Sequence, residues 1–464
     1  MKITFKDNGK ELGEEILFVS VNPKNKDEIV RENGTKTLYL KCEEKEKMNL
    51  RKLFLLVRKM ISLAKGAKAE QLTFNFNDFR FRNSKITDLE LAEIIGSQLD
   101  FANYEFVEYK TPPKEGFSLI KEIFILGTSK EIQTAILKGN VVAREVNAAR
   151  SLANMPGGDM TPQILAKATK EAVKNLPVKV TVLGEKEMEK EKMEAILSVG
   201  SGSEEESKFI IIEYWGASNK KEKPIVLVGK GVTFDSGGIN LKPSSSLLGM
   251  NLDMSGGAAV IHTVALVAKM KLKKNVIGLI PSVENMASGG SYRPGDIIRS
   301  MSGATIEILN TDAEGRVILA DALFYAQKYN PELVIDIATL TGAAAVALGE
   351  RASAIFTEDD NLSKMMERLG EQTGDYLWRL PLWEEYENEI KGNLGDWTNI
   401  HNKDSRYGGA IYGAIYLLQF IKGYKWVHLD IASRMTSMQG EYLAQGALGT
   451  PVRLLLKTIE EYKK

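Results

Sequence analysis

The pattern of apolar and polar residues predicts that roughly the first 125 residues form a small α/β domain. Short segments with apolar residues at every second position predict strands, and longer segments with apolar residues three or four positions apart predict helices. We expect strands at Glu15–Val21, Thr37–Lys41, Gln71–Phe76 and Lys121–Leu126, and helices at Asn49–Lys65 and Asp88–Phe101. Strands that alternate with helices are typical of a sheet covered by helices.

A longer helical pattern, from about Ser129 to Leu152, connects this region to the rest of the chain. It ends at Asn154–Gly158, a cluster that contains a proline and two glycines and therefore predicts a helix terminus. We expect an N-terminal α/β domain of residues 1–145, with the connecting helix beginning near 129, and a second domain of residues 146–464.

Strand and helix patterns alternate again after residue 178. We expect strands at Val178–Leu183, Phe209–Tyr214, Ile225–Val228, Val276–Pro281, Ile306–Leu309, Leu333–Ile337, Ala354–Phe356 and Trp426–Ile431. We expect helices at Gly257–Met270, Arg316–Tyr329, Leu362–Leu369, Ala410–Ile421 and Pro451–Tyr462, and an earlier one that Thr161 caps and Pro162 begins. This order predicts a mixed, largely parallel sheet with helices on both faces. The charged run Glu185–Glu194 predicts a solvated helix face.

Length and composition agree with two domains of an ordinary globular protein. A chain of 464 residues exceeds what one hydrophobic core usually holds. Lys plus Arg and Asp plus Glu both number 61, so the formal net charge is zero. This balance does not favour a nucleic-acid partner, and DNA binding is kept as an alternative that requires a local basic patch. The single cysteine, Cys42, excludes an intramolecular disulfide and is expected to be a small buried side chain.

Nothing in the sequence predicts a membrane protein. The first seven residues, Met1–Asp7, lack the apolar stretch of a signal peptide. The longest runs with little charge lie near Gly256–Ala268 and Ile337–Gly349, and both are shorter than the roughly 20 apolar residues that cross a bilayer. With one cysteine and no such segment, we expect a cytoplasmic protein.

Candidate chemistry is concentrated in the segment Asn310–Arg316, between a predicted strand and a predicted helix. Such turns are where α/β proteins place their ligands. In an extended segment, alternate residues project to the same side, so Asp312, Glu314 and Arg316 are expected to converge. Two carboxylates beside a guanidinium suggest a site for a metal and an anion. The alternative is structural, with Asp312 as a helix cap and Glu314 favoured by the helix dipole.

A second cluster follows the strand predicted at Ile225–Val228. We expect a glycine-rich loop at Gly229–Gly238, which carries Lys230 and Asp235, and Lys242 and Asp253 come soon after. We expect its glycines to adopt backbone conformations that other residues avoid. The stretch lacks the spacing of a P-loop or of a dinucleotide-binding motif, which weakens the alternative of a phosphate-binding protein. Taken singly, Lys230 and Lys242 are typical of lysines on a protein surface, and Asp253 is typical of a residue that caps a helix.

Together the two clusters place four carboxylates at strand ends of one domain. Like charges that share a buried cleft repel each other and raise each other's pKa, so cations are needed to stabilise them. Two divalent ions balance four carboxylates, and paired ions clamp attacking and leaving groups in hydrolysis. Histidine ligands are not required: His262 and His428 are expected in the core, and His401 in a loop.

These segments resemble the leucyl (cytosol) aminopeptidase family. The resemblance covers the chain from about residue 145 onward and is weak before it. The residues that carry it are Asn154–Pro162, Gly229–Gly238, Lys242–Pro243, Asp253–Met254, Glu284–Met286, Arg293–Asp296, Asn310–Arg316, Ala338–Ala343 and Trp426–Ala432.

The resemblance implies a metal-dependent aminopeptidase with two divalent ions, Mn²⁺ or Zn²⁺, with Mg²⁺ or Co²⁺ as alternatives. Asp235 and Glu314 would bridge the ions, Lys230 and Asp253 would complete the tighter site, and Asp312 the more exchangeable one. Lys230 must then bind as a neutral amine, with its pKa lowered by the ions. A water between the ions would be the nucleophile, and the free α-amine of the substrate would be a further ligand.

The family also implies roles outside the metal ligands. Lys242 would polarise the scissile carbonyl group as an electrophile, and Arg316 would hold a bicarbonate ion that acts as the general base. The side-chain pocket for leucine-like residues would be lined by Met250, Thr339, Gly342, Ala432 and Met435. Ser433 stands where the family usually has glycine, which leaves the details of this pocket open. The expected assembly is a homohexamer that acts on peptides.

Overall fold

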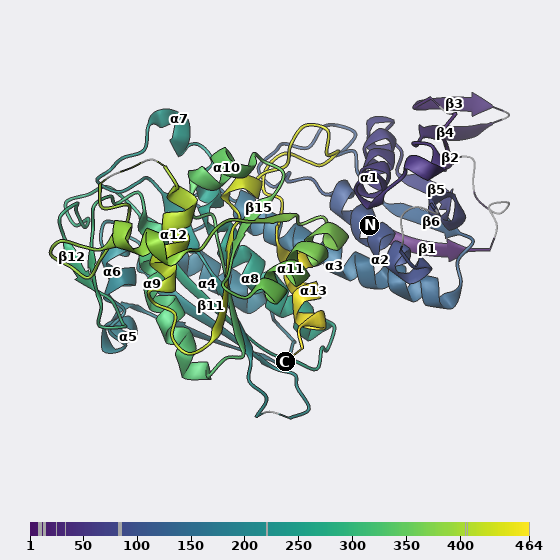
Figure 1. Cartoon of the computed structure of the whole chain (residues 1–464). Helices are drawn as coiled ribbons and strands as arrows, with labels where there is room; N and C mark the ends of the chain where they lie inside the picture. Colours follow the sequence, from purple (N-terminus) through teal and green to yellow (C-terminus); the bar gives the residue numbers. More distant parts are fainter. Residues whose placement is uncertain are drawn as a thin grey trace. The chain divides into compact units, whose positions relative to one another are not determined.

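The computed structural model describes residues 1–7, 12, 15–24, 26–32, 34–81, 86–219, 221–403, 405 and 407–463. They form two compact units, each with its own sheet and core (Figure 1). Unit 1 comprises Met1–Asn147 and Ser437–Gln445, and unit 2 comprises Ala148–Thr436 and Gly446–Lys464.

The described part of unit 1 contains a six-stranded sheet in the order β1-β6-β5-β2-β4-β3, in which only the β3–β4 pair is antiparallel. Its strands are β1 (Lys2–Lys6), β2 (Leu17–Asn22), β3 (Glu28–Glu32), β4 (Thr35–Lys41), β5 (Gln71–Asn75) and β6 (Glu122–Leu126). Its helices are α1 (Leu50–Gly66), α2 (Asp88–Asn103) and the first part of α3 (Lys130–Asn154), with short 3-10 turns at Lys45–Lys47 and Phe76–Phe79. The four predicted strands are found, whereas β1 and β3, the two edge strands, were not predicted. Neither has a fully buried face, so alternation gives little signal there.

The main sheet of unit 2 has the order β16-β15-β18-β14-β9-β11-β8-β7 in the described residues, with β10 paired to β11. Its strands are β7 (Val178–Leu183), β8 (Lys208–Trp215), β9 (Ile225–Gly229), β10 (Gly231–Asp235), β11 (Asn275–Asn285), β14 (Leu333–Ala338), β15 (Ser353–Phe356), β16 (Leu377–Arg379) and β18 (Lys425–Asp430). The central run β18-β14-β9-β11 is parallel, and antiparallel pairs lie toward both edges. The prediction of a mixed, largely parallel sheet is confirmed.

Helices cover both faces of this sheet (Figure 1). The helices of this unit that follow α3 are α4 (Pro162–Ala172), α5 (Glu185–Lys190), α6 (Glu194–Gly200), α7 (Ser244–Leu247), α8 (Ser255–Lys269), α9 (Glu314–Ala326), α10 (Gly342–Leu348), α11 (Asp360–Thr373), α12 (Gly409–Leu418) and α13 (Val452–Glu461). Val226 and Val228 of β9 share a core cluster with residues of α9 and α12. On the other side, α8 packs against β9 and β11 and is itself packed by α4 and α13.

The carboxyl end of β9 lies where the chain changes direction across the sheet. From β9 the chain reaches one neighbour, β11, through α8, and then returns through α9 to the other neighbour, β14. Loops at such a switch point leave in opposite directions and open a crevice for ligands. Lys230 directly follows β9, so it stands at this crevice.

Three local predictions need correction. The stretch Gly229–Gly238 was expected to be a loop, but Gly231–Asp235 forms strand β10 beside β11. The charged run Glu185–Glu194 is not one helix, because it breaks at Lys192, whose φ is +61°, between α5 and α6. A second, three-stranded sheet joins β12 (Ile297–Arg299) and β13 (Thr305–Glu307), which come before α9, to β17 (Trp397–Thr398), which comes after it, and only β13 was predicted.

Other single-residue predictions are confirmed. Cys42, His262 and His428 are buried, and Thr161 accepts a hydrogen bond from the Ile164 N–H as the cap of α4. No helix in the described ranges has the length and apolar content that crossing a membrane requires.

Helix α6 begins without a capping side chain of its own, and a buried aspartate from α9 takes that role. The carboxylate of Asp321 accepts hydrogen bonds from the N–H groups of Ala195, Ile196 and Met301 at 2.9, 3.1 and 2.7 Å. Burial raises the pKa of Asp321 to about 7, although these three hydrogen bonds lower it.

The raised pKa of Asp321 predicts how stability depends on pH. The folded protein holds the Asp321 proton more tightly than the unfolded chain does. The contribution of this carboxyl group to the free energy of unfolding is therefore complete below pH ~4 and is lost as the pH rises through about 7. Unfolding by urea should therefore show a stability loss of up to ~1.4 kcal/mol per pH unit in this window. The Asp321→Asn variant should be less stable but lack this slope, and an identical slope in both proteins would contradict the assignment.

Candidate functional site

Lys230 lies at the centre of the crevice. Its ammonium Nζ lies 2.8 Å from Asp253 Oδ2 and 2.7 Å from Glu314 Oε1 and donates a 3.2 Å hydrogen bond to the Thr339 carbonyl oxygen. Asp253 belongs to the 3-10 turn η4 (Met250–Met254), and its Oδ1 accepts a 2.6 Å hydrogen bond from the Thr339 hydroxyl. The Lys230 side chain is only 3% exposed, so the alternative interpretation of Lys230 as a surface lysine is not found.

Asp235 and Lys242 form the neighbouring part of the cluster. Asp235 is the last residue of β10, and its Oδ1 accepts hydrogen bonds from the Gly237 N–H at 2.9 Å and the Asn285 side-chain amide at 2.8 Å. Its other oxygen, Oδ2, lies 2.7 Å from Lys242 Nζ. Lys242 also pairs with Asp312, so one ammonium group joins carboxylates from two segments.

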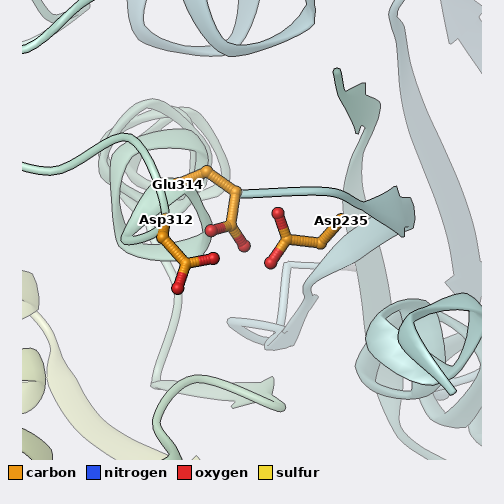
Figure 2. A group of neighbouring side chains, drawn as sticks. All are labelled: Asp235, Asp312 and Glu314. Atoms are coloured by element: carbon orange, nitrogen blue, oxygen red, sulfur yellow. The ribbon is translucent and has the colours of Figure 1, made fainter. Parts of the chain in front are cut away.

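Asp312 and Glu314 reach the cluster from the start of α9. Figure 2 shows their carboxylates directed toward that of Asp235, and the ligand atoms of these three residues lie within 4.8 Å of one another. The extended conformation expected for residues 312–316 is wrong, because Asp312 lies in a turn and Glu314 is the first residue of the helix. The alternative roles of Asp312 and Asp253 as helix caps are not found, because α9 and α8 both begin without a capping side chain.

Two glycines of the stretch after β10 have the unusual backbone conformation that was expected. Gly237 and Gly238 have φ values of +89° and +64°. They turn the chain so that the Gly237 N–H faces Asp235. Gly229 and Gly231 lie in strands instead, where a Cβ would come within 2.6 Å of the Gly256 carbonyl oxygen or 2.7 Å of the Pro281 one.

The residues present suit divalent cations. The oxygens Asp253 Oδ2, Asp312 Oδ1 and Glu314 Oε1 are buried and make no hydrogen bond of proper geometry to any described residue, although each lies against a lysine ammonium group. Four carboxylates meet two ammonium groups, so four negative and two positive charges leave two negative charges uncompensated among these six side chains. Carboxylate oxygens are the preferred ligands of hard divalent ions.

Burial and mutual repulsion perturb the ionisation of these groups. Burial and the charge of Glu314 raise the pKa of Asp235 to about 6, against the opposite effects of Lys242 and Lys230. Burial likewise raises the pKa of Asp253 and of Glu314, and Lys230 opposes it. Burial lowers the pKa of Lys230, but the three carboxylates around it outweigh burial and place that pKa above its usual range. Clusters of perturbed groups in a crevice are typical of functional sites.

Gly315 leaves the space that the Lys230 side chain occupies. A Cβ on Gly315 would lie 2.6 Å from both Cε and Nζ of Lys230, and those atoms are held by two carboxylates. We expect Gly315→Ala to displace Lys230 and to reduce kcat/KM of the expected aminopeptidase reaction about a hundredfold. A displacement of ~1 Å in a preorganised site lowers the rate by roughly this factor.

Gly66→Ala provides the matched control for Gly315→Ala. Gly66 also lies in a helix, but a Cβ there meets nothing within 4 Å. The control should keep wild-type kcat/KM and metal content. Full activity in a folded Gly315→Ala protein would show that the position of Lys230 does not matter.

The guanidinium of Arg316 follows Glu314 by two residues, is buried, and has one unpaired donor within the described chain. Its Nη1 donates a 2.8 Å hydrogen bond to the Asn399 carbonyl oxygen, and its Nε makes none within the described chain. Burial lowers the pKa of Arg316, and Glu314 is among the groups that oppose this effect.

Several residues that hold the ligands in place had no predicted role. The Asn285 amide joins Asp235 to the Thr311 carbonyl oxygen, which also accepts a hydrogen bond from the Tyr292 hydroxyl. The Thr311 hydroxyl donates to the Gly237 carbonyl oxygen at 2.6 Å and so joins the two ligand-bearing segments. Asn285 ends the long apolar strand β11, and a polar residue at such a strand end was the available signal.

The residues expected to line a side-chain pocket lie on three segments. Met250 begins η4, Thr339 follows β14, Gly342 begins α10, and Ala432 and Met435 lie in and after η7 (Ala432–Arg434). Thr339 contacts Asp253 of η4, and α10 packs against η7, so the three segments are neighbours. The hydroxyl of Ser433 donates a 2.6 Å hydrogen bond to the carbonyl oxygen of Ala352, which lies outside these three segments. The hydrogen of this hydroxyl is therefore not directed at the residues expected to line the pocket.

Comparisons with known proteins agree on one family. The catalytic-domain model of the cytosol aminopeptidase family matches residues 147–456. The chain is 44% identical over 366 residues to a probable cytosol aminopeptidase of Roseiflexus castenholzii, which covers 78% of this chain and 74% of the relative. It is 42% identical over 422 residues to one of Rickettsia massiliae, with 90% and 83% covered.

Among solved structures, the fold is similar to that of the bottromycin maturation enzyme BotP. The TM-score is 0.85 at 28% identity, over 96% of this chain and 98% of that one. A second structure of BotP, in complex with Mn, matches with a TM-score of 0.84. The family match over residues 147–456 and the identities to its relatives show that this chain belongs to the cytosol aminopeptidase family of metal-dependent aminopeptidases.

Proposed function

We propose that this aminopeptidase removes leucine-like residues from the N-termini of peptides with two divalent ions. The proposal rests on one observation, the meeting of four carboxylates and two lysines at the carboxyl ends of β9 and β10 and the start of α9. The residues that would hold the ions are Lys230, Asp235, Asp253, Asp312 and Glu314. Mn²⁺ and Zn²⁺ are the expected ions, with Mg²⁺ and Co²⁺ as alternatives.

When bound, the ions supply Lewis-acid activation of the hydrolytic water and of the peptide carbonyl group. Lys230 serves as a ligand only as a neutral amine, and its contacts with Asp253 and Glu314 place it where an ion would displace the proton. The Gly237 and Asn285 donors fix Asp235 Oδ1, which leaves Oδ2 directed toward Lys242 and the other proposed ligands. The free α-amine of the substrate would be a further ligand, which would restrict cleavage to the N-terminus.

Two cations of the chain act on the peptide bond in this proposal. Lys242 bridges Asp235 and Asp312 at the rim of the cluster, and its ammonium group would stabilise negative charge that develops on the carbonyl oxygen. Arg316 would hold a bicarbonate ion as the general base, and its Nε is a donor that the described chain leaves unpaired. Met250, Thr339, Gly342, Ala432 and Met435 would line the pocket for the substrate side chain.

The family resemblance also supports a homohexamer in the cytoplasm, with residues 146–464 as the catalytic domain and 1–145 as a separate N-terminal domain. Sedimentation velocity of the full chain should give a mass near six times 51.4 kDa. A monomer at micromolar concentration would contradict the hexamer without affecting the chemistry.

Metal removal provides the direct test of the proposed reaction. After dialysis against a chelator, the protein should release leucine from leucine amide at most at ~1% of its initial rate, because Lewis-acid activation is worth several kcal/mol. Added Mn²⁺ or Zn²⁺ should restore the rate.

N-acetyl-leucine amide provides the control substrate, because it lacks the free amine and should not be cleaved by the metal-loaded protein. Undiminished activity of the chelated protein would refute the metal mechanism. Cleavage of the acetylated substrate would refute the requirement for a free α-amine.

A further inference from the structure

Asp430, the last residue of β18, is fully buried and uses both carboxylate oxygens. Its Oδ1 accepts hydrogen bonds from the N–H groups of Leu340, Thr341 and Ala432 at 3.1, 3.4 and 3.2 Å. Its Oδ2 accepts a 2.6 Å hydrogen bond from the Thr341 hydroxyl. One carboxylate therefore joins the loop after β14 to the turn after β18.

These two segments carry four of the five residues proposed to line the substrate side-chain pocket. Residues 339–342 include Thr339 and Gly342, and residues 432–435 include Ala432 and Met435. Backbone pairing of β14 with β18 ends with the Ile431 N–H, which donates to the Ala338 carbonyl oxygen at 2.8 Å. Beyond this point, the two segments are joined by the hydrogen bonds that Asp430 accepts from both of them.

The same carboxylate orients the start of α10. Thr341 is the N-cap of this helix, and its hydroxyl accepts a 3.2 Å hydrogen bond from the Ala344 N–H. A hydroxyl has one hydrogen to donate, and Asp430 takes it, so the lone pairs of Thr341 face the helix. Loss of the carboxylate would release the cap and the loop together.

We propose that Asp430 is a positioning residue that sets the spacing between residues 339–342 and 432–435 and thereby the selectivity of the pocket for leucine over smaller side chains. This inference rests on the proposed function. Asp430 contacts no metal-ligating side chain in the described structure, so it acts through the backbone of the two segments. A pocket whose walls are held by buried charge-assisted hydrogen bonds has a defined width, and one without them relaxes.

The test compares Asp430→Ala with Asp430→Asn. We measure kcat and KM for leucine amide and alanine amide with the metal-loaded, full-length protein. The alanine variant should raise KM for leucine amide and reduce the leucine-to-alanine ratio of kcat/KM about tenfold, the size of effect that one methylene produces in such a pocket. The asparagine variant should keep most of the ratio, because its oxygen still accepts from the three backbone N–H groups, although its NH2 group can no longer accept the hydrogen of the Thr341 hydroxyl.

Asp336→Ala is the matched control. Asp336 is equally buried, on the neighbouring strand β14, but its carboxylate accepts from the Trp426 indole at 2.6 Å and contacts the His428 ring within the sheet. Its loss should reduce stability and leave the selectivity ratio unchanged. An equal shift in both alanine variants would mean general loosening and would overturn the proposal.

Other outcomes are also decisive. A folded Asp430→Ala protein with the wild-type ratio would overturn the inference, as would an asparagine variant that is no better than alanine. If Asp430→Ala does not fold, Thr341→Ala removes one of the four contacts and should shift the ratio in the same direction by a smaller factor, and an unchanged ratio there would overturn the proposal. A wild-type protein that cleaves neither amide would instead refute the proposed function.

Discussion

Replacing Glu314 with alanine is expected to reduce kcat/KM for leucine amide at least about a thousandfold, because it removes a ligand proposed to bridge both ions, whose activation is worth several kcal/mol. Glu314 lies against Lys230 from the first position of α9, and its carboxylate is grouped with those of Asp235 and Asp312, whose ligand atoms all lie within 4.8 Å of one another (Figure 2). Elemental analysis should find fewer than two ions per chain. The fold should persist, since the change removes a buried carboxylate whose pKa burial has raised.

Glu307→Ala is the control for this variant. Glu307 is also a buried glutamate, seven positions earlier in β13, and it accepts hydrogen bonds from the N–H groups of Asn393 and Leu394. Its loss should lower stability but not the metal content. Equal activity of Glu314→Ala and wild type would remove the basis for the proposed metal site.

Replacing Lys242 with alanine is expected to lower kcat by two to three orders of magnitude, roughly the cost of deleting one transition-state donor, with little change in KM. Lys242 is positioned by two carboxylates, Asp235 and Asp312, and keeps some exposure at the rim of the cluster. The Lys242 ammonium group is proposed to stabilise negative charge that develops only in the transition state, so substrate affinity should be nearly unaffected by its removal. Steady-state kinetics at saturating Mn²⁺ would measure both constants.

Lys208→Ala controls for the loss of a buried lysine. The Lys208 side chain is 9% exposed and pairs with Glu206 at 2.6 Å, on the antiparallel strand β8. This variant should keep wild-type kcat. A Lys242→Ala protein with raised KM and unchanged kcat would instead assign Lys242 to uniform substrate binding.

The sequence predicted most of the elements that carry the site, because buried strands and amphipathic helices have strong periodic signals. The parallel strands around β9 were predicted within a few residues at most of their ends, as was α8. Weakly amphipathic elements were missed: β3 is exposed along most of its length, and β10 is interrupted by glycine and a bulge. Local pattern carries no information on pairing between strands, so β10 was taken for a loop.

The convergence of Asp312 with Glu314 was expected for the wrong reason. Their spacing suggested one face of an extended segment, yet one lies in a turn and the other begins a helix. The Thr311 hydroxyl donates to the Gly237 carbonyl oxygen and fixes this turn beside the end of β10, so that both carboxylates reach Asp235. That contact joins residues far apart in the chain, and no local pattern indicates it.

By itself, the sequence determined which chemical groups are available, that strands and helices alternate in unit 2, and which family the chain resembles. These properties depend on residue type and on short-range periodicity. Only the tertiary structure decided that Lys230 is buried between Asp253 and Glu314, that Gly315 makes room for it, and that Asp430 joins the two segments of the proposed pocket. Each of these contacts depends on the register of strands that are distant in the chain and on close packing. In a closely packed interior, adding or removing one side-chain atom changes which groups are in contact.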